Sequence, residues 1–388
     1  MEYKASFRHI LIVLLFLFVS LQSALGGTIY VDANATGANN GSSWENAYIY
    51  LQDALTAAIS GDNIWVAQGT YKPDRGNGIT IGDRVATFEL KAGVSIYGGF
   101  PIGGGTWEER DPNLYETILS GDLNGNDGPN LANNSENSLH VVHIGWANGT
   151  TTADGFIISG GNANGGGYKD GTSLGGGIYN GNGGNLILSN CIFADNFATY
   201  GGAVALKQTV VQGTFSGTTI SCCTFTNNLA GGGAFYLRGF SPVLKNCKFI
   251  KNNDSAIRCD SFSGFPTPEV YSNPTIINTV FIGNHTDYYG GAIYVRGQSS
   301  PKLVNCIFVG NSAVNGGAIY EDPVFVRTNA TYRNCTIVGN SASDQGGGMC
   351  YMKYGYSPLS SFKNCILWGN RDSSGINEWS QISELSHF

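Results

Sequence analysis

A six-residue motif recurs through the second half of the chain and constrains its fold more than any other feature. It reads Cys, any residue, a large apolar residue, two further residues and Asn, with Thr replacing Cys in one copy. The copies begin at Cys191, Cys223, Cys247, Thr279, Cys306, Cys335 and Cys365. The first and last begin 174 residues apart, so the mean period over six intervals is 29 residues. That length suits one three-strand coil of a solenoid, whose short apolar strands are buried only when coils stack.

A second motif, Gly-Gly-Ala followed by an apolar residue, lies between consecutive copies of the first. Side chains alternate between the two faces of a strand, so each position can be assigned to a face. With the alanine counted as zero, position +1 is predicted to face the interior and position +2 the outside. The residues at +1 are Ile178, Val204, Phe235, Ile257, Ile293, Ile319 and Cys350.

Asparagines are predicted to mark the bends of the coils. The last position of the six-residue motif is always Asn, namely Asn196, Asn228, Asn252, Asn284, Asn311, Asn340 and Asn370. The residue before the motif is Asn in six copies and Cys222 in the seventh. Amides stacked at the strand spacing of about 4.8 Å can bond from rung to rung and satisfy the backbone of the turns.

The N-terminus is typical of a secretory signal peptide at residues 1–26. Lys4 and Arg8 precede an apolar run from Ile10 to Val19, and small residues follow before Gly27. The run is about half as long as the ~20 residues that a membrane-spanning helix requires. After cleavage we expect no transmembrane segment, and a protein that is secreted or lies on the outer surface of a bacterium.

Residues 27–388 are predicted to form one parallel β-helix domain. Its coils are expected to be irregular over 27–174 and regular over 175–370. The chain ends one coil after its last repeat without a polar cap. We therefore expect it to be truncated at its C-terminus.

A short amphipathic helix is predicted over Asn46–Ile59. Ser42–Glu45 has the spacing of a capping box, and apolar residues then recur at helical intervals. Such a helix would plug the open end of the core, where an exposed sheet edge would invite aggregation. Strands are expected at Ile64–Ala67, Val94–Tyr97, Leu139–Ile144 and Phe156–Ser159.

Charge and composition exclude one class of partner. The net charge is −7 and Lys and Arg are scattered, so the basic patch of a nucleic-acid-binding protein is missing. Charged residues make up only 13% of the chain and glycine supplies 56 of 388 residues, a balance that suits tight, stacked turns. We expect a monomer that binds no nucleic acid.

The Gly-Gly-Ala-Ile and Phe-x-x-Asn elements resemble the repeats of chlamydial polymorphic outer membrane proteins, within the pectin-lyase-like group of right-handed parallel β-helices. The segments Ile29–Asp32, Gly41–Trp44, Ile64–Ala67 and Gly69–Tyr71 resemble the start of many secreted bacterial β-helix proteins. The resemblance implies an all-β, single-stranded right-handed parallel β-helix. It implies no particular activity, because this fold hosts many functions.

Nine cysteines in an exported protein ordinarily indicate disulfides. Six of them begin copies of the repeat and share one inward slot. Neighbouring Cβ atoms there would lie about 4.8 Å apart, beyond the ~3.8 Å typical of a disulfide, so buried free thiols are expected. Cys222, Cys259 and Cys350 lie outside this slot and are the cysteines expected to pair.

The outer face is predicted to carry a tyrosine column beside a charged one. Position +2 reads Tyr179, Ala205, Tyr236, Arg258, Tyr294, Tyr320 and Tyr351, and position +4 reads Gly181, Lys207, Arg238, Asp260, Arg296, Asp322 and Lys353. Tyrosine rings edged by Lys and Arg can hold an anionic sugar chain. The predicted ligand-binding residues are Tyr236, Tyr294, Tyr320, Tyr351, Lys207, Arg238 and Arg296. Alternatively, the tyrosines shield the sheet and the mixed charges compensate one another.

No catalytic residue can be assigned from the sequence. Asp260 and Asp322 stand two rungs apart with Arg296 between them. By strand spacing the two carboxylates would be roughly 9 to 10 Å apart, which leaves a paired-carboxylate role open.

A weak calcium loop is predicted at Asp122, Asn124 and Asn126. The match is incomplete, because Asp127 and Asn133 stand where a calcium-binding loop has Gly and Glu. The alternative is an acidic loop that merely turns. No cofactor other than this calcium ion is expected.

Two functions fit these observations. We favour a non-catalytic module that serves as an adhesin or stalk, or that binds a glycan. Its expected partner is an extracellular polysaccharide or a glycan on a host or cell surface. The alternative is a carbohydrate-active enzyme, either a polysaccharide lyase or a glycoside hydrolase, which rests on the resemblance in fold.

Overall fold

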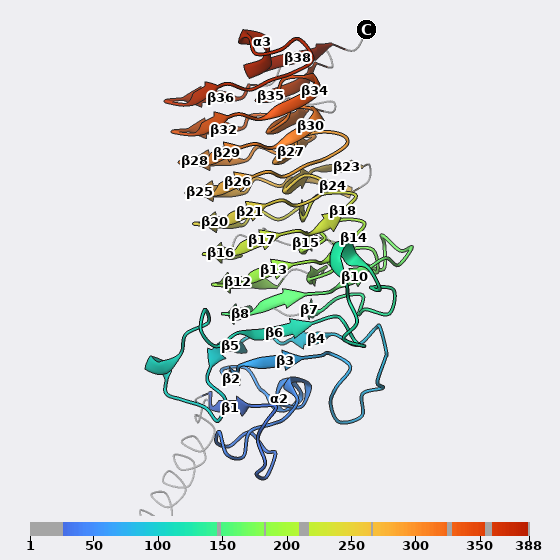
Figure 1. The fold of residues 1–388 in the computed structure, drawn as a ribbon, viewed down its shortest axis with the longest axis vertical. Coiled ribbons are helices and arrows are strands. Elements are labelled where there is room, and N and C mark those ends of the chain that lie inside the picture. The colour runs from blue at the N-terminus through green and yellow to red at the C-terminus, as the bar shows by residue number, and fades with distance from the viewer. Residues whose placement is uncertain are drawn as a thin grey trace, which may run out of the picture.

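The computed structural model describes residues 26–145, 149–181, 184–208, 217–264, 267–323, 328–353 and 359–386. Parallel strands are wound into a column of stacked coils, which is a parallel β-helix (Figure 1). The predicted all-β solenoid is therefore confirmed. Residues 1–25 of the predicted signal peptide lie outside the described residues. Within the described ranges, no helix combines the length and the apolar character needed to cross a membrane.

Three parallel sheets, which we call A, B and C, form the faces of the column, and each regular coil passes from A to B to C. In the described part of the chain, sheet A contains β1 Thr28–Val31, β2 Asn63–Ala67, β5 Ser95–Phe100, β8 Thr150–Asp154, β12 Asn185–Ser189, β16 Thr219–Ser221, β20 Val243–Lys245, β25 Thr275–Ile277, β28 Lys302–Val304, β32 Thr331–Arg333 and β36 Ser361–Lys363. Sheet B contains β3 Gly69–Tyr71, β6 Thr117–Ser120, β9 Ile157–Ser159, β13 Ile192–Ala194, β17 Thr224–Thr226, β21 Lys248–Ile250, β26 Val280–Ile282, β29 Ile307–Val309, β33 Thr336–Val338 and β37 Ile366–Trp368. Sheet C contains β4 Phe88–Leu90, β7 Val142–Ile144, β11 Ile178–Asn180, β15 Val204–Lys207, β19 Phe235–Arg238, β22 Ile257–Asp260, β27 Ile293–Arg296, β31 Ile319–Asp322, β35 Met349–Lys353 and β38 Ile382–Ser386.

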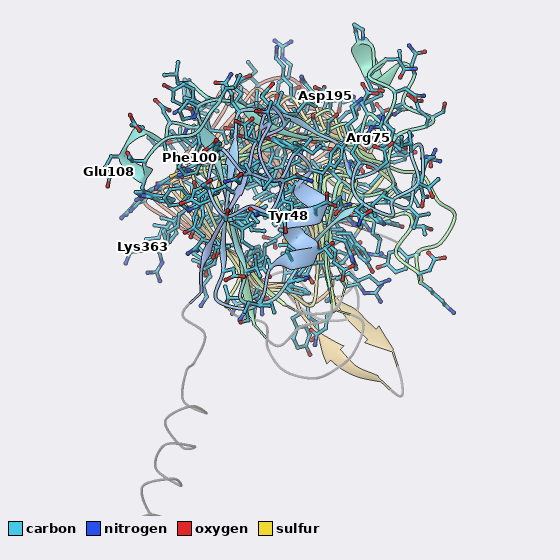
Figure 2. The ribbon with its side chains drawn as sticks, turned by 90° about the horizontal axis from the view of Figure 1, so that it is seen from below. Tyr48, Arg75, Phe100, Glu108, Asp195 and Lys363 are labelled. Atoms are coloured by element: carbon cyan, nitrogen blue, oxygen red, sulfur yellow. The ribbon has the colours of Figure 1, made fainter. Side chains whose placement is uncertain are left out.

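Further elements lie outside the three sheets. They are β10 Asn162–Ala163, β14 Phe197–Ala198, β18 Leu229–Ala230, β30 Ser312–Asn315, β34 Ser341–Gln345, the 3-10 turns η1 Trp107–Glu109 and η2 Pro129–Leu131, and the helix α3 Glu378–Gln381. An antiparallel hairpin of β23 Phe262–Gly264 and β24 Thr267–Val270 projects sideways from the column (Figure 2). The four predicted N-terminal strands are confirmed as β2, β5, β7 and β9, with β7 beginning three residues later than expected.

The interior is filled by position +1 and by the apolar residue of the six-residue motif. At +1 the side chains from Ile178 to Ile319 are fully buried, as predicted. Parallel pairing in register places like residues over one another, so five phenylalanines stack with ring centroids 4.4 to 5.1 Å apart. They are Phe193, Phe225, Phe249, Phe281 and Phe308.

The asparagines that end the motif form a continuous buried ladder, as predicted. From Asn196 to Asn340, each Nδ2 donates to Oδ1 of the next asparagine at 2.9 to 3.1 Å. The last member, Asn370, donates to Gln381 of α3 at 2.8 Å. The residues that precede the motif have φ between 50° and 55°, so they form the sharp bend from sheet A to sheet B.

The predicted helix over Asn46–Ile59 is shorter than expected. The helix α2 covers Leu51–Ala57, and the capping box at Ser42–Glu45 is wrong because these residues form turns. The backbone of Tyr48 donates to the carbonyl of Tyr30 and extends sheet A, so the chain cannot become helical until later. The buried face of α2 joins the main core and lies across the N-terminal end of the column, as expected (Figure 2).

The nine cysteines are all free thiols. Those of the inward slot are buried or half-buried, as predicted. The expected pairing among Cys222, Cys259 and Cys350 is wrong, because these thiols lie in three different environments. Cys222 is exposed, Cys259 belongs to the main core and Cys350 belongs to a cluster outside sheet C.

The last coil departs from the predicted register by one residue. Cys350 pairs with Tyr320, and Tyr351 pairs with Glu321. Cys350 rather than Tyr351 therefore occupies position +2, and the prediction that Cys350 faces the interior is wrong. Three consecutive glycines, Gly346–Gly348, allow two alignments of the Gly-Gly motif. A slip of one residue moves every side chain to the opposite face of a strand.

Candidate functional site

Side chains on the outer face of sheet C form two apolar clusters that are separate from the main core. The first is made of Leu174, Tyr179, Ala205 and Tyr236, and the second of Tyr294, Tyr320, Cys350 and Met352. The outward direction predicted for position +2 is thus confirmed as far as Tyr320. The prediction that this tyrosine column is open to a ligand is wrong, because Tyr236 and Tyr320 are each only 1% exposed.

Tyr168, from the loop before β11, covers the first cluster. Its hydroxyl lies 2.8 Å from that of Tyr236 and accepts a hydrogen bond from Arg238. Lys207 donates to the carbonyl of Tyr168 at 2.5 Å, and its Nζ lies 3.9 Å from the ring centroid. Burial, assisted by the charge of Arg238, lowers the pKa of Lys207 to about 8. These predicted ligand residues are therefore engaged with Tyr168.

Tyr200 and Tyr289 complete the outer layer, and neither was predicted from the sequence. Tyr200 lies 5.1 Å from Tyr236, and Tyr289 lies 5.9 Å from Tyr294, measured between ring centroids. Each directly precedes a Gly-Gly pair. An aromatic residue at that position is the sequence signal that could have indicated a covered tyrosine column.

Arg258 lies between the two clusters, on the rung between Tyr236 and Tyr294. Its guanidinium carbon is 4.9 Å from the ring centroid of Tyr294, and Nε donates to Asp260 at 3.0 Å. Burial acts to lower the pKa of Arg258, but the charge and hydrogen bond of Asp260 help to outweigh that effect and raise it. Arg258 is therefore a fixed cation on the outer face of sheet C.

A pocket of 310 Å³ opens beside the second cluster, and we call it the tyrosine-arginine pocket. It is lined by Gly231, Asp254, Arg258, Tyr288, Tyr289, Tyr294 and Arg296. Two predicted ligand residues, Tyr294 and Arg296, are thus brought together there. Tyr288 is 68% exposed and the side chain of Arg296 is 48% exposed. Tyr351 does not line this pocket and donates to Glu384 at 2.9 Å.

Two carboxylates flank these groups. The hydroxyl of Tyr294 donates to Asp322 and that of Tyr236 donates to Asp260, each at 3.1 Å. Burial raises the pKa of Asp322, although the hydrogen bond from Tyr294 opposes the shift. Oδ1 of Asp322 is buried and has no hydrogen-bond partner in the described part of the chain. Asp322 is therefore a largely buried carboxyl group with a raised pKa.

The residues predicted to bind calcium, Asp122, Asn124 and Asn126, lie in one short loop. The Asp122 carboxylate accepts backbone hydrogen bonds from Gly125, Asn126 and Asp127 at 2.6 to 3.1 Å, as in an ordinary turn. The acidic side chains that approach it are those of Asp127 and Glu136, with oxygens of all three within 4.8 Å of one another. Burial and the charges of these neighbours raise the pKa of Asp127, although Asn137 opposes the shift.

Comparison with known proteins agrees with the fold. A family model described as a right handed beta helix region matches residues 146–323. No curated protein matches the chain. The chain is similar to a solved pectate lyase, Pel9A, at 14% identity and a TM-score of 0.42, over 92% of this chain and 82% of that one.

Two further solved structures are similar at lower scores. PfbA, a surface adhesin of Streptococcus pneumoniae, aligns at 14% identity and a TM-score of 0.31, over 87% of this chain and 75% of PfbA. A rhamnogalacturonan lyase aligns at 12% identity and a TM-score of 0.27, over 91% of this chain and 75% of the lyase. Alignments with these scores carry no inference about activity.

Proposed function

We propose that the chain is a secreted or cell-surface β-helix module that binds an acidic glycan in the tyrosine-arginine pocket and does not alter it chemically. The observation that carries this proposal is the presence of exposed Tyr288 and Arg296 at one pocket. The predicted signal peptide supports export. The resemblance of the repeats to those of chlamydial polymorphic outer membrane proteins supports a place on the cell surface.

The chemistry of the pocket suits a sugar that carries a carboxylate. A tyrosine ring offers a flat apolar surface with a polar edge, which fits the C–H face of a sugar ring. Nε of Arg296 lies 3.9 Å from Asp322, beyond hydrogen-bond distance, so its guanidinium can form a bidentate pair with a ligand. Arg258 lies beside it, and its charge is compensated by the ion pair with Asp260, so Arg296 is the cation that meets the ligand.

Other acidic residues near the pocket are engaged in the fold. Asp254 accepts hydrogen bonds from the hydroxyl of Thr286 and the backbone of Gly233. Asp260 accepts hydrogen bonds from Arg258 and Tyr236. Carboxylates held in this way stabilise the structure of the pocket. A role in binding requires less rearrangement of their hydrogen bonds than a role in catalysis does.

A glycoside hydrolase is the second candidate, and Asp322 is the residue that favours it. Its raised pKa and unpartnered Oδ1 are properties of a general acid. Asp260 lies two rungs away from Asp322 and is paired with Arg258 on its own strand. It would be the complementary carboxylate. Glycoside hydrolysis commonly uses two carboxyl groups that differ in this way.

Titration calorimetry with oligogalacturonates and with uncharged galacto-oligosaccharides tests the proposal. We expect the acidic oligomers to bind, and Arg296→Gln to weaken binding by about tenfold or more, because a charge-assisted bidentate contact is lost. Arg333→Gln is the matched control, since Arg333 is an exposed arginine on sheet A, remote from the pocket. Its affinity should equal that of the wild type.

Product analysis on the same samples separates the two candidates. Unchanged oligomers after prolonged incubation support the binding module. New reducing ends that disappear in Asp322→Asn would replace it with the hydrolase. Failure of the wild type to bind any acidic oligomer would contradict the proposal.

A further inference from the structure

The asparagines that precede each motif form a second ladder, which lies on the outside of the column. We call it the outer ladder, and its positions are Asn190, Cys222, Asn246, Asn278, Asn305, Asn334 and Asn364. These residues are exposed at the corner between sheets A and B. From Asn334 to Asn246, each Nδ2 donates to Oδ1 of the preceding member at 3.2 Å.

Cys222 breaks this ladder. A thiol at that position offers no Oδ1 to accept a hydrogen bond from Nδ2 of Asn246. It also has no Nδ2 to donate a hydrogen bond to Oδ1 of Asn190. Among the described residues, Nδ2 of Asn246 and Oδ1 of Asn190 have no hydrogen-bond partner, while Nδ2 of Asn190 donates to Asp154 at 3.0 Å. The break therefore presents one free donor and one free acceptor to solvent.

A groove of 470 Å³ opens at this break, along the corner between sheets A and B where the strands β9, β13, β17 and β21 begin. Its lining includes Asn190, Cys222 and Asn246, together with Thr224 and the exposed Lys248. No carboxylate belongs to the described lining of the groove. The lining therefore combines amide, hydroxyl and cationic groups with the apolar side chains of Pro112, Ile157 and Ile192.

Arg110 forms one wall of the groove and is held in place by its neighbours. Its guanidinium pairs with Asp154 and donates to the carbonyl of Gly98. The guanidinium carbon also lies 5.2 Å from the ring centroid of Trp107, which is 45% exposed. Because Asp154 is neutralised by Arg110, Lys248 sets the charge that a ligand would meet.

We propose that this groove binds one anionic sugar unit in the gap that Cys222 leaves in the outer ladder. Asn190 and Asn246 are two rungs apart, or about 10 Å, and a hydrogen bond at each end takes up about 3 Å. The remaining ~4 Å is close to the distance between two hydroxyl oxygens of one sugar ring. Its hydroxyls accept from Asn246 and donate to Asn190, and its carboxylate or sulfate pairs with Lys248.

This site is separate from the tyrosine-arginine pocket. The groove lies at the corner of sheets A and B, whereas the pocket lies on the outer face of sheet C. The two sites share no lining residue. Arg296→Gln should therefore leave binding in the groove unchanged, so either site can fail its test without affecting the other.

Alkylation of Cys222 provides a direct probe, because this thiol is exposed within the proposed site. We expect galacturonate oligomers, or a sulfated galactose oligomer, to slow the reaction of Cys222 with iodoacetamide at least about tenfold at saturation. An uncharged galactose oligomer should protect it much less. Protection by only one acidic oligomer identifies carboxylate or sulfate as the preferred anion, and protection by neither overturns the proposal.

The variant Cys222→Asn tests the ladder itself. Asparagine tolerates the positive φ of 53° found there and would bridge Asn246 to Asn190, which fills the gap. In the Arg296→Gln background, where the pocket is weakened, we expect the calorimetric affinity for the acidic oligomer to fall at least about tenfold while thermal stability is kept or increased. Cys222→Ser keeps the gap open and should bind as the wild type does. Equal affinities in the Asn and Ser variants would overturn the proposal, and Lys248→Gln, expected to lose affinity, tests it independently.

Discussion

Tyr289 lies against Tyr320, with ring centroids 4.5 Å apart and ring planes inclined by 23°. Tyr320 belongs to β31, whereas Tyr289 comes from the segment before β27. A residue outside the strands thus covers a tyrosine on the outer face of sheet C and leaves it only 1% exposed. The solenoid therefore has small outer cores as well as the central one.

Replacing Tyr289 should destabilise the fold because it uncovers this outer core. We expect Tyr289→Ala to lower the free energy of unfolding by about 2 kcal/mol, through the lost ring contact and the apolar surface exposed. Urea denaturation followed by circular dichroism measures the change. Tyr288→Ala is the adjacent control, and its exposed side chain predicts a change within about 0.5 kcal/mol. Equal effects of the two substitutions would contradict this account.

The inner asparagine ladder should be far more sensitive than the outer one. Asn284 is fully buried, accepts from Asn252 and donates to Asn311. Asn284→Ala removes the acceptor of the Asn252 amide and backbone N–H groups and the donor to the carbonyl of Phe249, all of them buried, so we expect a loss of about 3 kcal/mol in urea denaturation. Asn305→Gly, in the exposed outer ladder, keeps the positive φ and lets water replace the lost bonds, so its loss should stay below about 1 kcal/mol. Similar losses at both positions would show that burial does not separate the ladders.

The repeat period made the coil and its interior predictable, because each repeat places the same chemistry at the same place. Ile178 and Ile293 could be assigned to the interior by alternation alone, and Asn284 to a ladder by its recurrence. The alternation of side chains along a strand predicts which face each side chain points to, but it does not predict whether another residue covers it. Tyr320 is covered by Tyr289, whose place before a Gly-Gly pair was the one available signal, whereas Tyr236 is covered in part by Tyr168, from a connecting segment without a fixed period, so the pattern could not reveal that contact.

Register in the last coil was ambiguous for a local reason. Gly346 has a φ of 64°, which matches the 65° of Gly316, so these two glycines occupy equivalent turns. In the sequence, the pairs Gly346-Gly347 and Gly347-Gly348 fit the Gly-Gly motif equally well. Backbone conformation decides between the alternatives, and a residue pattern does not contain it.

Lys251 occupies a turn position where glycine is better suited. Its φ is 50°, and the equivalent residues of later coils are Gly283, Gly310 and Gly339. Relief of the left-handed strain should outweigh the added entropy of an unfolded glycine, so Lys251→Gly should stabilise the protein by about 0.5 to 1 kcal/mol in urea denaturation. Gly310→Ala is the reverse test. A Cβ there would meet open space, so its expected loss of about 1 kcal/mol would come from the backbone. A destabilised Lys251→Gly would contradict the strain argument.

Glu321 should make stability depend on pH. It is fully buried, and its carboxyl group accepts hydrogen bonds from Thr328, Tyr332 and Ser360 at 2.7 to 2.8 Å. Burial raises its pKa above the ordinary value of 4.5, although the three hydroxyl groups oppose the shift. Above pH 4.5 the unfolded chain releases this proton while the folded chain retains it. The free energy of unfolding should therefore decrease as pH rises, by at most about 1.4 kcal/mol per pH unit, until the folded pKa is passed.

Glu321→Gln removes the titrating group and keeps the shape of the side chain. We expect the variant to gain stability relative to the wild type as pH rises from 4.5, measured by urea denaturation at half-unit steps up to pH 9. Glu108→Gln, at an exposed glutamate, should follow the wild type throughout. Parallel pH profiles of wild type and Glu321→Gln would mean that folding does not shift the pKa of this carboxyl group. The opposite trend, with the wild type gaining on the variant, would mean that its three hydroxyl donors outweigh burial and lower its pKa.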